Sequence, residues 1–171
     1  MFSPRVCNSF TLFETTTEEV SKLIDGLNKR KGNRINDIPT RIVKLSNGVI
    51  APFLSNIFNI CMSQGCYPSL LKIAHVIPIF KTGNREECAN YRPISLLSNF
   101  NRIFEKILYT RIYAFFEKYS LLNFHQYGFR PSHSTGMAVY DILESKLKNK
   151  DKGKYSCAVY LDLSKAFNTV D

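Results

Sequence analysis

The chain has 171 residues, 44% of them hydrophobic and including thirteen Phe and nine Tyr, a composition that excludes a disordered tail. A chain of this length buries roughly 70% of its extended surface, which is enough for one ordinary domain with a core. It has no run of about 20 apolar residues and no apolar segment at its start, which excludes a membrane span and a secretory signal.

The formal net charge is +9, and residues 81–154 carry thirteen Lys or Arg against seven Asp or Glu. Nucleic acid is therefore the first partner to consider, although a solvated basic surface explains the same charge equally well. The absence of a C-x-x-C pair predicts reduced thiols in an intracellular protein, nuclear or cytoplasmic, with no zinc site and no disulfide partner. The five cysteines are Cys7, Cys61, Cys66, Cys88 and Cys157.

Three helices are predicted in the first 65 residues. The first spans about 15–27, where threonines and glutamates supply a cap and first-turn acids before an apolar pattern of helical spacing. A short helix at 39–45 begins with a proline, which the first turn of a helix tolerates. Apolar residues again recur at helical spacing from residue 50 until Gly65 ends the third helix.

The residue pattern in the middle of the chain predicts a strand and two helices. Residues 73–80 are apolar and β-branched, and Pro78 places this strand at an edge or ends it early. A long helix is predicted over about 98–119, with an apolar stripe that needs a covering partner. Ser134 caps a further helix that ends in the lysine-rich segment 146–154. We interpret that segment as a helix end and loop in water, with phosphate binding as the alternative.

A last strand is predicted over 155–163, where apolar residues alternate with small or polar ones. Strand side chains alternate between faces, so Cys157, Val159 and Leu161 are expected in a core and Asp162 on the opposite face. That second face is open enough for a substrate. A carboxylate at the end of a strand is by itself most often a solvated strand end.

Four segments occur together in a fixed order, and they resemble the motifs of non-LTR retrotransposon (LINE) reverse transcriptases. The match is greatest to jockey-type elements and more distant to group II introns, and it covers about residue 35 to the end. Each segment alone is a weak signal, whereas all four in order are specific. The segments are 77–81 (IPIFK), 90–96 (NYRPISL), 126–130 (QYGFR) with Ser134 and Thr135, and 160–167 (YLDLSKAF).

The resemblance implies a helix-rich α/β (α+β) fold, made of the fingers and the first palm strand of a right-hand polymerase. Residues 1–34 would form an N-terminal helical extension, 35–154 the fingers, and 155–171 the start of the palm. It also implies RNA-directed DNA synthesis, in which a primer 3′-hydroxyl attacks a deoxynucleoside triphosphate opposite an RNA template.

Two basic residues match the family positions that hold the incoming triphosphate, Lys81 and Arg92. A guanidinium fork can bind two phosphate oxygens at once, while a lysine acts as a point charge. The alternative for Arg92 is a surface ion pair with Glu86 or Glu87. The alternative for Lys81 is an ordinary lysine at a turn after a strand.

The segment around Gly128 resembles the part of the fingers that lies along the template. Gly128 would allow a backbone conformation or a close approach that a side chain blocks. Arg130, Ser134 and Thr135 offer donors that phosphates accept. A tight loop with Ser134 as a helix cap is the structural alternative, and both interpretations can hold together.

Asp162 matches the first catalytic aspartate of the family, and the resemblance implies that it binds Mg²⁺ together with the backbone carbonyl of Leu163. Magnesium prefers hard oxygen ligands, and polymerases use two such ions. Phe167 matches the aromatic that packs under the nucleotide sugar and favours deoxynucleotides. Its alternative is a core phenylalanine in the turn after the strand.

The sequence departs from the family at Asn168, where an aspartate is usual, and this change suggests a decayed copy. The family's second catalytic segment, with two adjacent aspartates, is absent from these 171 residues. The isolated chain is therefore predicted to be inactive, although its partners in the complete enzyme would be RNA template, DNA primer and dNTPs. The alternatives are a non-catalytic RNA-binding fragment and the translated remnant of a decayed retrotransposon.

Overall fold

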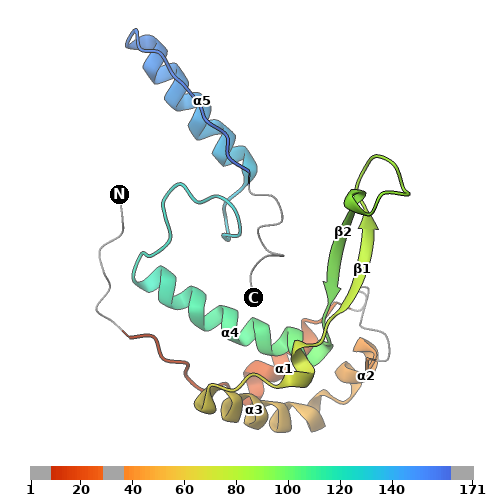
Figure 1. Cartoon of the computed structure of the whole chain (residues 1–171). Coiled ribbons are helices and arrows are strands. Elements are labelled where there is room, and N and C mark those ends of the chain that lie inside the picture. The colour runs from red at the N-terminus through yellow and green to blue at the C-terminus, as the bar shows by residue number, and fades with distance from the viewer. Residues whose placement is uncertain (1–8, 29–36, 163–171) are drawn as a thin grey trace. The chain divides into compact units, whose positions relative to one another are not determined.

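The computed structural model describes residues 9–28 and 37–162. The chain divides into two compact units, Met1–Leu121 and Leu122–Asp171, whose elements are drawn in Figure 1. The boundary between the two units follows Leu121. The assignment of residues 35–154 to the fingers and of 155–171 to the start of the palm stays a prediction. None of the helices in the described part is long and apolar enough to cross a membrane.

The first helix of the N-terminal unit is α1 (Thr17–Asp25), and its start follows the predicted capping pattern. The Thr16 hydroxyl accepts a hydrogen bond from the Glu19 N–H at 3.2 Å. Glu18 and Glu19 lie in the first turn, where the helix dipole favours negative charge. Local sequence is therefore sufficient to place this helix.

Ser46 alone separates helix α2 (Thr40–Leu45) from helix α3 (Asn47–Gln64). Pro39 occupies the cap position of α2, where its fixed backbone angle is compatible with a helix start. Gly65 ends α3 with a φ of +62°, a left-handed conformation that glycine adopts without strain. Both helices agree with the sequence predictions.

The core of the N-terminal unit lies where α1, α2 and α3 meet α4 (Asn99–Lys118). Ser98 caps α4 by accepting the Asn101 N–H at 3.1 Å. The rings of Phe58 and Phe104 stack at 4.7 Å between centroids and 7° between planes. The predicted apolar stripe of α4 thus has its covering partners along part of its length. The core residues are Val20, Ile24, Val43, Ala51, Phe58, Met62, Ile103, Phe104 and Ile107.

A two-stranded antiparallel hairpin connects these helices, formed by β1 (His75–Phe80) and β2 (Tyr91–Leu96). Short 3₁₀ turns precede each strand, η1 (Ser69–Lys72) and η2 (Cys88–Asn90). The sequence predicted β1 as an edge strand, and in a two-stranded sheet each strand is an edge. It did not predict β2, because a proline and polar residues interrupt its apolar pattern.

The C-terminal unit contains α5 (Thr135–Asp151), whose cap is Ser134 as predicted: the hydroxyl accepts the Met137 N–H at 3.3 Å. The strand predicted over 155–163 is not observed in its described part, 155–162. A strand requires a partner for its backbone groups, and β1–β2 is the sheet of the described residues. Val159 and Leu161, expected in a core, are exposed, so this prediction was wrong for 155–162. The coarse prediction of a helix-rich mixed fold is confirmed.

Candidate nucleotide and nucleic-acid site

Lys81 and Arg92 lie on one face of the β1–β2 hairpin. The register pairs Ile79 with Arg92, and the Lys81 N–H extends the ladder by donating to the Asn90 carbonyl at 2.8 Å. Side chains alternate between faces along each strand, so Ile79, Lys81 and Arg92 share a face. Lys81 and Arg92 are diagonal cross-strand neighbours, a separation that long side chains can span. The family motifs predicted that both residues hold the triphosphate, whereas the strand pairing that brings them together was not predicted, because β2 was not expected to be a strand.

Two prolines stand opposite each other in the hairpin, Pro78 and Pro93. Hydrogen-bonded and non-bonded pairs alternate in an antiparallel ladder. Since Lys81 bonds to Asn90, counting back along the register puts the proline pair at a non-bonded position. At such a position the backbone N–H points away from the partner strand, so its absence in proline removes no hydrogen bond of the ladder. The ladder beside Arg92 remains intact.

The loop at the end of the hairpin is held by Asn90, which the sequence analysis did not identify. Its side-chain amide donates to the Asn84 carbonyl at 2.8 Å and to the Glu87 carboxylate at 3.1 Å. Gly83 has a φ of +95°, and a Cβ there would lie 2.7 Å from Asn90 Nδ2. Glycine is required at this turn both for the backbone angle and for the approach of Asn90.

Lys81 and Arg92 are both exposed. Neither Lys81 nor Arg92 forms a salt bridge with any described residue. The alternative of an ion pair between Arg92 and Glu86 or Glu87 is thus not observed, and Glu87 instead accepts the Asn90 amide. Two neighbouring cations that form no salt bridge with a described residue can bind a polyphosphate.

The predicted template segment forms an irregular loop before α5. Arg130 is half-buried and donates from Nη1 to the Asn123 carbonyl at 3.1 Å, while its buried Nε has no partner among the described residues. Gly128 does not have a positive φ, and a Cβ there would meet no other atom of the described residues within 4 Å. A close approach of the template to Gly128 stays a prediction. Phe129, 89% exposed, takes the left-handed conformation instead, with a φ of 61°. Thr135 is exposed in the first turn of α5.

Asp162 is exposed, as its predicted role requires. A carboxylate is the ligand type that Mg²⁺ prefers. The described residues contain no group of three His, Cys, Asp or Glu side chains that could hold a metal ion. Asp162 could supply one oxygen ligand. Leu163 and Phe167 lie outside the described residues. Lys81 and Arg92 belong to the other unit. That they serve one nucleotide site together with Asp162 is what the family resemblance implies, and it stays a prediction.

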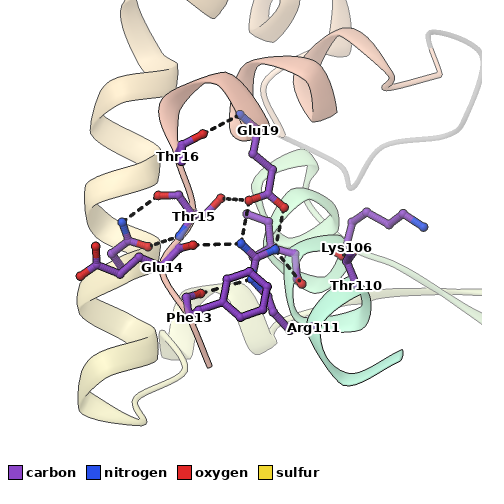
Figure 2. Close-up of polar contacts among 10 residues, drawn as sticks. Phe13, Glu14, Thr15, Thr16, Glu19, Lys106, Thr110 and Arg111 are labelled. Atoms are coloured by element: carbon purple, nitrogen blue, oxygen red, sulfur yellow. Dashed lines mark hydrogen bonds and ion pairs between the residues drawn. The ribbon is translucent and has the colours of Figure 1, made fainter. Parts of the chain in front are cut away.

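Arg111 is a buried arginine that the sequence analysis missed, and it joins the N-terminal segment to α4 (Figure 2). Arg111 is 2% exposed, and its guanidinium donates to both Glu19 carboxylate oxygens at 2.6 Å. Further bonds reach the carbonyls of Phe13, Glu14 and Ile107. These bonds from Arg111 hold the pKa of the Glu19 carboxyl below its ordinary value, against the effect of burial. One sequence feature could have identified Arg111: a basic residue four positions after Ile107, within the apolar stripe of α4.

The sequence matches known proteins over most of its length. The family model described as reverse transcriptase (RNA-dependent DNA polymerase) matches residues 79–171. A probable RNA-directed DNA polymerase from transposon BS of Drosophila melanogaster is 30% identical over 90% of this chain and 17% of that protein. The RNA-directed DNA polymerase from mobile element jockey of the same species is 29% identical over 95% and 18%. The chain therefore spans less than a fifth of the length of these curated relatives, and the predicted family resemblance is confirmed.

Proposed function

This chain belongs to the reverse transcriptase (RNA-dependent DNA polymerase) family, and we propose that its β1–β2 hairpin binds the triphosphate of the incoming nucleotide. The reaction served would be extension of a DNA primer on an RNA template. The primer 3′-hydroxyl oxygen bonds to the α-phosphorus, and the bond to the β-phosphate breaks with release of pyrophosphate. The hairpin would form part of the fingers of a right-hand polymerase.

The observation that carries this proposal is the placement of Lys81 and Arg92 on one face of the hairpin. The Arg92 guanidinium would bind two phosphate oxygens together, and the Lys81 ammonium would neutralise a third. Folding stability gives no reason to place two cations side by side, because like charges at neighbouring cross-strand positions repel. A ligand with several negative charges removes that repulsion.

Mg²⁺ is the metal we propose for the complete site, where it would neutralise charge on the phosphates and orient the 3′-hydroxyl. Asp162 would supply one ligand, and the Leu163 carbonyl a second. Phe167 would pack under the nucleotide sugar. Arg130, Ser134 and Thr135 would contact the template, and for Ser134 this role is additional to capping α5.

Nucleotide binding by the 171-residue chain tests the role of the hairpin. We expect a fluorescent dATP analogue to bind, and Arg92→Ala to weaken binding by roughly tenfold or more, the effect of losing a charge-assisted bidentate contact. Arg92→Lys should restore only part of the affinity, since it keeps the charge without the fork. Arg41→Ala, which removes an exposed arginine of α2, is the matched control. Equal affinities for Arg92→Ala and Arg41→Ala would refute the hairpin as the triphosphate site.

The chain alone is expected to lack polymerase activity. The sequence contains no two adjacent aspartates, and a two-metal site needs more carboxylates than Asp162 provides. We therefore expect no primer extension on an RNA template with Mg²⁺. A non-catalytic RNA-binding role for the chain by itself is the alternative. Incorporation of labelled nucleotide that disappears in Asp162→Ala would show that it is wrong.

A further inference from the structure

The C-terminal end of α3 brings two cysteines together, Cys61 and Cys66. The Cys66 N–H donates to the Cys61 carbonyl at 3.0 Å, and the Gly65 N–H donates to the Met62 carbonyl at 3.4 Å. With Gly65 in the left-handed conformation, these two bonds define a Schellman motif. The two residues that the longer-range bond of this motif joins commonly have side chains in contact, and here both side chains are thiols.

The same hydrogen bond limits the distance between the two cysteines. The Cα of Cys66 is bonded to the donor nitrogen, and the Cα of Cys61 lies two bonds from the acceptor oxygen. The two Cα atoms are therefore no farther apart than about 7 Å, the largest separation that a disulfide spans without movement of the backbone. Residues five positions apart in a regular helix do not share a face, so the proximity comes from the helix end.

The two thiols have different surroundings, and both are free. Cys61 is half-buried and packs against the core, whereas Cys66 is exposed. Burial raises the pKa of the Cys61 thiol, and the nearby Cys66 raises it further. This second effect agrees with a side-by-side placement of the two side chains. Cys66 is the thiol that a dissolved oxidant reaches first.

We propose that Cys61 and Cys66 are a redox-sensitive dithiol, which a small disulfide such as oxidised glutathione converts to an intramolecular disulfide. The Cys66 thiolate bonds to one sulfur of the oxidant, whose S–S bond breaks with release of one glutathione thiolate. The Cys61 thiolate then bonds to the Cys66 sulfur and displaces the second glutathione. The protein thiols lose two electrons to the oxidant, and their two protons pass through solvent to the released glutathiones. The reduced thiols predicted from the sequence would be the resting state of this pair.

The bond would connect α3 to a segment that is anchored on α4. Tyr67 follows Cys66 directly, and its ring packs on Phe104 with 5.2 Å between centroids. The Tyr67 hydroxyl also donates to the Asn101 side chain. If the fold brings the two sulfurs together, the bond must stabilise the fold in return. Oxidation is therefore expected to make the N-terminal unit more resistant to unfolding.

Oxidation of the full chain by oxidised glutathione, followed by mass spectrometry, tests the proposal. The parent protein carries Cys7→Ser, Cys88→Ser and Cys157→Ser, which leaves Cys61 and Cys66 as its cysteines. We expect the chain to lose the mass of two hydrogen atoms, and both thiols to disappear at the same rate within one peptide. Dithiothreitol should restore both thiols. A lasting product with glutathione on Cys66 and a free Cys61 would overturn the proposal.

The matched control moves one thiol within α3. Cys66→Ser/Ser63→Cys keeps two cysteines, now at positions 61 and 63 of the helix, where side chains do not face each other. We expect this variant to accumulate glutathione adducts in place of the intramolecular bond. An equal yield of intramolecular disulfide in the two proteins would overturn the proposal, because nearness in sequence would then explain the bond without the helix end.

Urea unfolding of the parent protein supplies a second measurement. We expect the oxidised form to unfold at a higher urea concentration than the reduced form, and dithiothreitol to cancel the difference. Cys61→Ser, which cannot form the bond, should show no such increase after the same treatment. A lower midpoint after oxidation would overturn the proposal, since the fold would then hold the two sulfurs apart.

Discussion

At the scale of single residues, Arg111 shows how burial determines what a charged side chain does. It lies in the apolar stripe of α4, and Glu19 together with backbone carbonyls of the N-terminal segment occupies its donors (Figure 2). The Phe13 ring adds a cation–π contact at 4.4 Å. A buried guanidinium with all of these partners is committed to the fold, whereas the exposed Arg92 remains available for a ligand.

We expect Arg111→Ala to lower the free energy of unfolding by about 3 kcal/mol, because it leaves Glu19 and several carbonyls without their donor. Arg111→Lys should recover part of that loss, since a lysine keeps the charge but has fewer donors. Lys148→Ala breaks the exposed pair with Glu144 and should cost about 0.5 kcal/mol or less. Urea unfolding of the three variants measures these differences. An Arg111→Ala variant as stable as Lys148→Ala would show that the buried Arg111 does not stabilise the fold.

The same pair makes stability depend on pH. The pKa of Glu19 is lowered in the folded state, mainly by the hydrogen bonds from Arg111. A carboxyl with a lowered pKa contributes stability above its unfolded pKa of about 4.3, and that contribution is lost as pH falls through the folded value. The free energy of unfolding should therefore decline below about pH 4, and less steeply in Glu19→Gln. Identical pH profiles for the two proteins would show that Glu19 is not the responsible group.

At the scale of elements, the helices were predictable because their signals are local. Ser98 and Ser134 each precede an apolar pattern, and Gly65 follows one. Strands depend on partners elsewhere in the chain, which explains both failures: β2 was missed, and residues 155–162 lack the expected pairing. The family motifs identified Lys81, Arg92 and Asp162 as candidates. They did not reveal that Asn90 supports the loop, since an asparagine at a turn is too common to single out.

The hairpin loop offers a test of the backbone argument. Gly83→Ala forces a side chain into a left-handed backbone conformation and against Asn90, so it should open the loop. The amide of Lys81, which donates to the Asn90 carbonyl, should then exchange with solvent faster by NMR. Gly128→Ala is the matched control, because a Cβ there meets nothing, and its own loop should keep its spectrum. A Gly83→Ala variant with unchanged Lys81 exchange would refute the strained-turn interpretation.

At the scale of the whole molecule, the two units differ in how much they bury. The N-terminal unit has a core that includes the Phe58–Phe104 stack, whereas no described residue between 122 and 162 is buried. Several apolar side chains of α5 are exposed, among them Val139, Tyr140 and Leu147. Few buried contacts mean low local stability.

Hydrogen exchange followed by mass spectrometry should separate the units. We expect the amides of α5 to exchange much faster than those of α4 around Ile103 and Ile107, although both segments are helical. The physical reason is that packing, and not the helix alone, sets the free energy of local opening. Protection of α5 as strong as that of α4 would show that the C-terminal unit has a stability that its exposure does not explain.

The most direct test of the central claim is the reactivity of Lys81 towards acetylation, with and without a deoxynucleoside triphosphate. If the hairpin binds the triphosphate through Lys81 and Arg92, nucleotide should protect Lys81 in a saturable way. Arg92→Ala should shift this protection to nucleotide concentrations that are higher by roughly tenfold or more. Lys118, an exposed lysine at the end of α4, should react equally under all conditions. Protection of Lys118 to the same extent as Lys81, or no protection of Lys81 at any nucleotide concentration, would contradict the assignment.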